Sequence, residues 1–147
     1  MFKHILVPMD GSALSRKALK QGLMLAKKLK AKVSVVHIAI PFAAVMYGEI
    51  GPGWETAEQQ MRALALRDGR KHLERARTIA RSSGMKINRF LIETVPVWKG
   101  IVDTARIKRC DAIFMGAHGH GALSSLLLGS QTNAVLAHSK IPVMVIR

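Results

Sequence analysis

Short apolar runs alternate along the chain with longer segments in which apolar residues recur every three or four positions. The short runs are apolar on both faces, which is typical of strands in a parallel sheet that helices cover on both sides. The pattern predicts five strands, at Phe2–Val7, Lys32–Ile38, Met85–Ile92, Asp111–Met115 and Pro142–Ile146.

The longer segments have the spacing of amphipathic helices. They predict four helices, at Ser12–Lys30, Trp54–Ser83, Val97–Arg109 and Ser130–Ser139. Ser12 is a good N-cap and Gly84 a good C-terminal cap. Pro41–Gly53, with two prolines and three glycines, predicts a loop. Because strands and helices alternate throughout, we expect a doubly wound α/β fold with a five-stranded parallel sheet, in one domain spanning residues 1–147.

Composition narrows the class of protein. Hydrophobic residues make up 49% of the chain, as in a folded protein. No apolar run approaches the ~20 residues of a membrane-spanning helix. The first residues lack the long apolar centre of a signal peptide, so we expect a cytoplasmic protein. Cys110 is the only cysteine, which excludes an internal disulfide and favours burial as a small hydrophobic residue.

The net charge is unusually high. Lysine and arginine total 23 against 9 acidic residues, a formal charge of +14. Such an excess attracts polyanions, although a solvated basic surface is the simpler interpretation. The predicted long helix is especially basic, with Arg62, Arg67, Arg70, Lys71, Arg75, Arg77 and Arg81. Acidic residues interrupt this series, and only 5% of the chain is aromatic, so base-stacking platforms are scarce.

Three strand ends, those of the first, second and fourth strands, carry candidate chemistry, because ligands of doubly wound sheets bind beyond the carboxyl ends of the strands. Asp10 follows the first strand, where its carboxylate can accept hydrogen bonds from a ribose or help to order a cation. An ordinary helix-entry turn is the alternative interpretation. At the end of the second strand, the main chain of Ile38 can read an adenine edge. We expect His37 beside it to be a hydrogen-bonded core histidine.

The fourth strand leads into a glycine motif, Gly116-x2-Gly119-x9-Gly129-Ser130. Glycines allow a tight turn and close approach of an anion, and the first N–H groups of the following helix lack intrahelical partners. The motif therefore predicts a phosphate site, with a glycine-rich crossover loop as the alternative. The Walker and dinucleotide-binding motifs are absent. His118 and His120 have no evident carboxylate partner for a zinc site.

The glycine motif resembles the nucleotide motif of the universal stress protein family, Gly-x2-Gly-x9-Gly-Ser/Thr. The resemblance covers almost the whole chain, from Val7–Ser12 at the first strand end to Ile141–Ile146 in the last strand. It implies a sheet in the order 3-2-1-4-5, with ATP at the carboxyl edge and magnesium or manganese carried by the triphosphate. It also implies a homodimer paired through the last strand, with Val143–Ile146 as candidate contacts.

The resemblance implies roles for the residues at matching positions. Those around the adenine and ribose are Pro8, Asp10 and Ile38. Those on the ribose and phosphate side are Met115, Gly116 and Gly119. Those that present N–H groups to the phosphates, with a hydroxyl from Ser130, are Gly129, Ser130 and Gln131. Many ATP-binding relatives carry valine at the position of Gln131, and this departure changes packing more than phosphate capture. The family often has glycine at the position of Thr94, where threonine reduces backbone freedom.

The sequence is compatible with three functions. The first is a stress-response module in which a bound adenine nucleotide biases a conformation or dimer that partners recognise. The second is slow ATP hydrolysis, with Asp10 or His118 as candidate groups; it ranks lower because the motif contains no lysine or arginine to stabilise the transition state. The third is binding of nucleic acid or an anionic membrane through the basic surface.

Overall fold

Five parallel strands form one sheet in the computed structural model, which describes residues 1–44, 51–120 and 128–147. The strands are β1 (His4–Pro8), β2 (Lys32–Ala39), β3 (Asn88–Glu93), β4 (Ala112–Gly116) and β5 (Val143–Ile146). Their order is β3-β2-β1-β4-β5, and every neighbouring pair is parallel. The helices are α1 (Ala13–Leu29), α2 (Trp54–Ser82), α3 (Val97–Ile107) and α4 (Ser130–His138). The predicted fold class and strand order are therefore confirmed.

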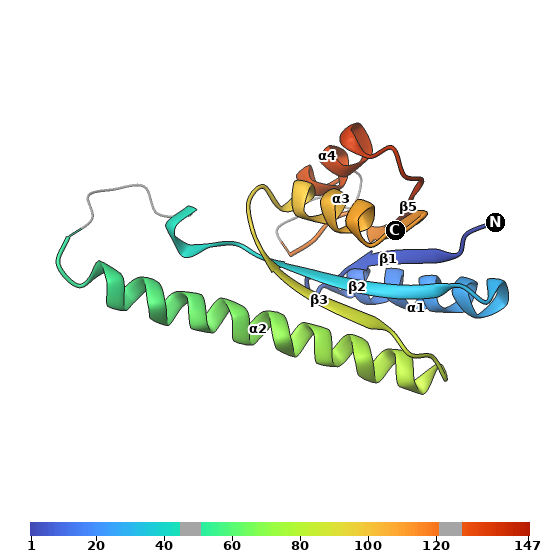
Figure 1. Cartoon of the computed structure of the whole chain (residues 1–147), viewed down its shortest axis with the longest axis horizontal. Coiled ribbons are helices and arrows are strands. Elements are labelled where there is room, and N and C mark those ends of the chain that lie inside the picture. Colours follow the sequence, from blue (N-terminus) through green and yellow to red (C-terminus); the bar gives the residue numbers. More distant parts are fainter. Residues whose placement is uncertain (45–50, 121–127) are drawn as a thin grey trace.

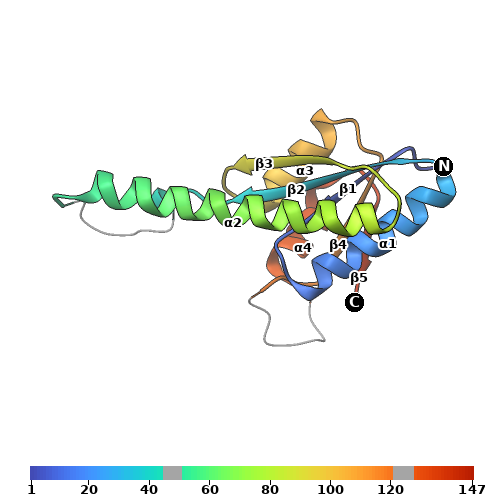
Figure 2. The same ribbon diagram turned by 90° about the horizontal axis from the view of Figure 1, so that it is seen from below.

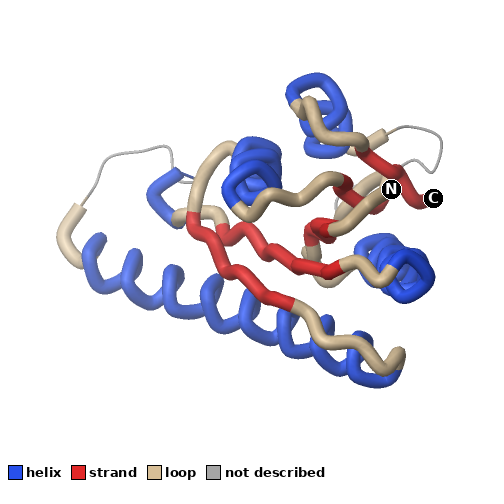
Figure 3. Tube along the Cα trace, turned by 45° about the vertical axis from the view of Figure 1, so that its right-hand side comes forward, coloured by secondary structure: helices blue, strands red, loops and turns tan. Residues whose placement is uncertain are grey.

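Helices cover both faces of the sheet (Figures 1 and 3). Successive residues of a strand point to opposite faces, so Val35 and Val36 of β2 belong to different core layers. Val35 packs in the layer that contains Leu23 of α1 and Leu73 of α2. Val36 packs in the layer that contains Ile101 of α3 and residues of α4. The apolar character of both strand faces thus accounts for the two helical layers.

Observed element boundaries lie within two residues of the predictions, except at the start of β3. We expected that strand to begin at Met85, but it begins at Asn88. The N–H of Met85 donates to the carbonyl of Ala80 at 2.9 Å, so it closes the end of α2 instead of joining the sheet. Gly84 has a φ of 70°, which confirms its role at the helix end.

We expected the segment Pro41–Gly53 to be an irregular loop, but part of it is helical. Phe42–Ala44 forms a short 3-10 helix, and the ring of Phe42 stacks on that of Trp54 with centroids 5.4 Å apart. The remainder of this loop prediction at residues 45–50, and the middle of the glycine motif at residues 121–127, lie outside the described residues.

The longest helix, α2, is buried only toward its C-terminal end. It has 29 residues, and its buried positions are Gly69, Leu73, Ala76 and Ala80. Its first turns extend past the ends of the strands (Figures 1 and 2). Despite this length, neither α2 nor any other helix in the described parts of the chain is apolar enough to cross a membrane.

Cys110 lies between α3 and β4 and is only 5% exposed. It packs in the same core layer as Ile101. Burial, together with the negative charge of Asp111, raises the pKa of its thiol to about 11. Cys110 is therefore a buried, unreactive residue, as predicted.

We expect Gly69→Ala to lower the free energy of unfolding. A Cβ atom at residue 69 would lie 2.6 Å from Cδ1 of Leu91 and 2.7 Å from Cδ2 of His37. The His37 ring is fixed by a hydrogen bond to the Met9 carbonyl, so it cannot move freely. Overpacking of this kind costs about 1–3 kcal/mol, which exceeds the gain of about 1 kcal/mol that alanine has over glycine in a helix.

Gly22→Ala in α1 is the matched control, because its nearest contact would be Cγ2 of Val7 at an ordinary 3.4 Å. We expect this variant to be as stable as the wild type or slightly more stable. Urea unfolding followed by circular dichroism measures both variants. Equal effects at the two positions would contradict the packing argument.

Candidate functional site

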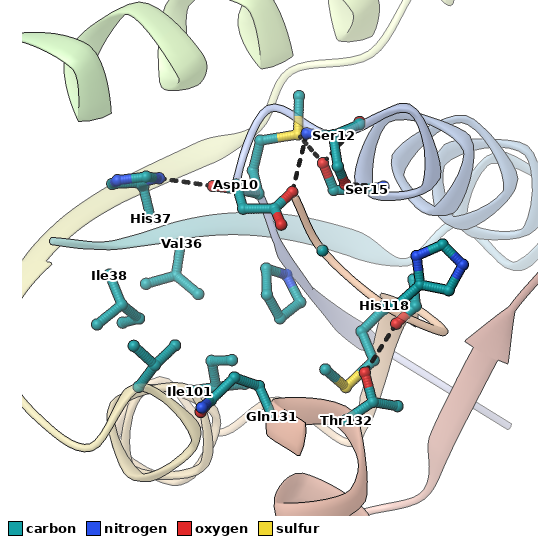
Figure 4. A pocket seen from close by; sticks show the side chains of 16 residues that line it. Asp10, Ser12, Ser15, Val36, His37, Ile38, Ile101, His118, Gln131 and Thr132 are labelled. Atoms are coloured by element: carbon teal, nitrogen blue, oxygen red, sulfur yellow. Dashed lines mark hydrogen bonds between the residues drawn. The ribbon is translucent and has the colours of Figure 1, made fainter. Parts of the chain in front are cut away.

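A cleft opens at the carboxyl ends of β1, β2 and β4 (Figure 4). The cleft has a volume of about 130 Å³ and is partly open to solvent. The sheet contributes Pro8, Val36, His37, Ile38, Met115 and Gly116 to the lining. The helices contribute Ser15, Val97, Ile101, Gln131 and Thr132.

The position of the cleft follows from the strand order. The chain leaves β1 for α1 on one face of the sheet and leaves β4 for α4 on the other. β1 and β4 are neighbours, so the two connections diverge and leave a crevice between them. This is the topological switch point at which doubly wound proteins bind ligands.

Asp10 is the acidic side chain among the described residues that line the cleft. Its Oδ1 accepts a hydrogen bond from the Ser12 N–H at 2.9 Å. Burial alone would raise the pKa of this carboxyl, but hydrogen bonds from Ser12 and the nearby charge of His120 outweigh burial, and the net pKa lies below its usual value. Asp10 is therefore ionised at neutral pH, and its charge faces the cleft.

Apolar side chains form the opposite part of the cleft. They are Val36, Ile38, Val97, Ile101 and Met115. Figure 4 shows Asp10 on one side of the opening and Ile101 with Gln131 on the other. An apolar surface opposite a carboxylate can bind a ligand whose flat ring packs on the apolar side chains and whose hydroxyl groups donate to the carboxylate.

Two of the motif glycines are required by close packing. A Cβ at Gly119 would lie 2.4 Å from Oδ2 of Asp10, and one at Gly116 would lie 2.8 Å from Cβ of Leu14. Both glycines line the cleft. A side chain at residue 119 would therefore displace the carboxylate, whatever ligand is bound.

The N–H of Gly129 is not available to a phosphate, contrary to our expectation. It donates to the Ala117 carbonyl at 2.7 Å, which closes the end of the glycine loop onto the start of α4. Nor does Gly129 or Ser130 belong to the described lining of the cleft. The amides of Ser130 and Gln131 lie in the first turn of α4, where no intrahelical acceptor exists.

The side chain of Gln131 has a role that the sequence did not indicate. Its Oε1 accepts a hydrogen bond from the Trp98 N–H at 3.0 Å, so it satisfies an amide in the first turn of α3. Thr132 makes a second unexpected link, because its hydroxyl donates to the Gly116 carbonyl at 3.0 Å. Side chains of α4 thus connect α3 and the end of β4 around the cleft. Neither contact has a local sequence signal.

Four histidines lie at or beside the cleft. His37 donates through Nδ1 to the Met9 carbonyl at 2.7 Å, the hydrogen bond expected of it, but it is only partly buried and lines the cleft. The His72 ring lies 5.2 Å from it, and burial lowers the pKa of His72. His120 donates to the Asp10 carbonyl at 2.9 Å, and His118 lines the cleft. Over residues 1–44, 51–120 and 128–147, no group of three or more acidic, histidine or cysteine side chains can hold a metal ion.

The universal stress protein family model matches residues 1–147, and the chain belongs to this family. The universal stress protein MJ0531 of Methanocaldococcus jannaschii is 30% identical over 149 residues, which cover 100% of this chain and 83% of that protein. A solved structure of the protein MJ0577 is 28% identical, with a TM-score of 0.83 and coverage of 99% and 96% of the two chains.

Two further solved structures are complexes with an adenine nucleotide. One is a universal stress protein in complex with cAMP, at 20% identity and a TM-score of 0.73, covering 99% of this chain and 97% of that chain. The other is from Archaeoglobus fulgidus in complex with dAMP, at 21% identity and a TM-score of 0.69, covering 99% and 98%. At these identities the likeness establishes the fold.

We expect Asp10→Asn to lower the free energy of unfolding at neutral pH. The folded-state pKa of Asp10 is depressed, so its ionised form stabilises the fold above the unfolded value of about 3.9. That contribution is lost as the pH falls through the folded-state pKa. The difference between variant and wild type should therefore shrink below about pH 4. Urea unfolding over a pH series measures it, and a difference that does not change with pH would contradict a stabilising role for the charge.

Proposed function

We propose that the cleft binds an adenine nucleotide, ATP with magnesium or manganese, and that the protein acts as a nucleotide-dependent binding module in a stress response. The observation that carries this proposal is the ionised Asp10 opposite an apolar surface at the topological switch point. The cAMP and dAMP complexes of related proteins support the choice of an adenine nucleotide.

Each part of the nucleotide has a matching surface in this proposal. The adenine packs on Ile38, close to Pro8, and Met115 lies toward the ribose, because these residues form the apolar and main-chain surfaces of the sheet edge. The ribose hydroxyls donate to Asp10. The phosphates lie on the side of Gly116 and Gly119, next to the first turn of α4.

The phosphate end of the proposed site relies on the first turn of α4. The amides of Ser130 and Gln131 lie at the positive end of this helix, which attracts anions. Gly129 shapes the approach without donating, because its amide is already bonded. A bound divalent cation would supply positive charge that balances the phosphates.

The lining favours binding over hydrolysis. None of the described residues that line the cleft is a lysine or an arginine. Phosphoryl transfer depends on positive groups that are fixed against the charge of the transition state. A module that holds ATP without rapid turnover fits these side chains better than an efficient hydrolase.

A homodimer through β5 belongs to the same proposal. β5 is an edge strand of the sheet, with an open row of main-chain hydrogen-bonding groups. Met144 on this strand is 47% exposed, so an apolar side chain is available to a second copy.

We expect Asp10→Asn to weaken ATP binding roughly 10- to 100-fold, because hydrogen bonds to a charged group contribute about 1.5–3 kcal/mol. Isothermal titration with ATP, and with GTP for comparison, measures the effect. The matched control is Asp111→Asn at the opposite edge of the sheet, where the carboxylate accepts from the Lys3 and His4 amides. That variant should retain wild-type affinity. Equal losses in the two variants, or no binding of any adenine nucleotide at millimolar concentration, would overturn the proposal.

A further inference from the structure

Four arginines form a row on one side of α2, outside the nucleotide cleft. This arginine row consists of Arg67, Arg70, Arg77 and Arg81, all of which are exposed. Their spacing of three, seven and four residues places them along one side of a helix with 3.6 residues per turn. At 1.5 Å per residue the row is about 21 Å long.

The arginine row lies along the outer edge of the sheet. Arg70 lines a groove between α2 and the edge strand β3, together with Glu74 of α2 and Arg89 of β3. On the opposite face of β3, the Nζ of Lys108 lies 4.4 Å from the centre of the Phe90 ring, which packs in the core layer of α3. Arginines of α2 and β3 therefore gather along this groove.

The two acidic residues within the row, Asp68 and Glu74, do not cancel its charge. The Oδ1 of Asp68 lies 4.0 Å from Nε of Arg67 and 3.4 Å from Nζ of Lys71, so two cations share this carboxylate. Glu74 is bound by Arg77 at 3.2 Å and also by Arg89, so two arginines share one carboxylate. Within the parts of the chain that the structure describes, neither Arg70 nor Arg81 takes part in an ion pair. The edge therefore keeps a net positive charge available to a partner.

We infer that the arginine row is a docking surface for the phosphate backbone of duplex nucleic acid. A DNA duplex carries one negative charge per about 1.7 Å of its axis with both strands counted, so a length of about 21 Å holds roughly a dozen phosphates, of which those on the near side can face the row. The row is straight and lies on a regular helix, which suits a rigid rod. The net charge of +14 adds a long-range attraction to the same partner. Contacts of this kind are made to phosphates and are independent of base sequence.

The surroundings of the row favour a duplex over a single strand. Single-strand binding proteins offer aromatic rings on which bases stack. Here the Phe90 ring of the adjoining strand β3 is covered by Lys108. Between Arg67 and Arg81, α2 carries no phenylalanine, tyrosine or tryptophan on which a base could stack.

The surroundings also favour nucleic acid over an anionic membrane. A helix that binds a membrane surface carries a broad apolar face beside its basic residues. The exposed large apolar residues of α2 are Met61 and Leu64, and both precede the arginine row. Between the arginines, the neighbouring exposed positions are polar, such as Lys71 and Thr78.

The test is binding to a labelled mixed-sequence DNA duplex, followed by fluorescence anisotropy over a range of salt concentrations. The variant Arg70→Gln with Arg81→Gln removes two charges without breaking an ion pair within the described residues. Each lost phosphate contact should reduce the slope of log K against log salt by about 0.9, and binding at low salt should weaken roughly tenfold or more.

The matched control is Lys20→Gln with Lys28→Gln on α1, which removes the same charge from exposed positions on another helix. It should keep the wild-type slope and affinity. An equal loss in both double variants would overturn the inference, because only diffuse net charge would then be at work. Binding to phosphatidylserine vesicles without binding to the duplex would overturn it in favour of a membrane. ATP titration of the arginine variant should give the wild-type result, which separates this inference from the proposed nucleotide site.

Discussion

Both faces of the central strands are apolar, and the rest of the molecule depends on the need to cover them. β2 sends Val35 to one core layer and Val36 to the other, so a helix is required on each side. Parallel strands can be joined only by crossovers, and these place all the carboxyl ends at one edge. When neighbouring strands then lead to helices on opposite faces, a cleft forms between them. The position of the candidate site is thus a consequence of core packing.

Within that cleft, Asp10 depends on its closest neighbours. Ser12 supplies the hydrogen bond that keeps the carboxylate ionised, and Gly119 supplies the space in which it lies. The position of the Asp10 carboxylate therefore requires a glycine at residue 119 whether or not a phosphate binds. A nucleotide that binds here meets a charged group that the fold has already positioned, so little rearrangement of the first turn is needed on binding.

Much of the fold and part of the candidate site could be predicted from the sequence, since both rest on local patterns. Short runs that are apolar on both faces located all five strands, and strand ends located Asp10 and Ile38. The errors arose where one specific main-chain hydrogen bond decides the outcome. We expected Met85 to lie in a strand, but its amide donates to the Ala80 carbonyl. We expected the Gly129 amide to be free, but it donates to the Ala117 carbonyl.

The contributions of α3 and α4 to the cleft could not be predicted from the sequence. Gln131 accepts from Trp98, a residue 33 positions earlier, and no short-range pattern reports such a contact. Val97 and Ile101 have the spacing of an apolar helix face, but the sequence does not say whether that face meets the core or a ligand. In this fold both answers hold, because Ile101 packs in the core and also lines the cleft.

The uneven burial of α2 divides one helix into two parts with different dynamics. Its last turns are anchored by Leu73 and its buried neighbours, whereas the turns before Gly69 contain no buried residue. Isolated helical turns are marginal in water, so this first part opens at little free-energy cost while the remainder opens only when the core does. Amide protons before Gly69 will therefore exchange with deuterated solvent well ahead of those near Leu73. A protease will likewise cleave the first half of the helix well before the second.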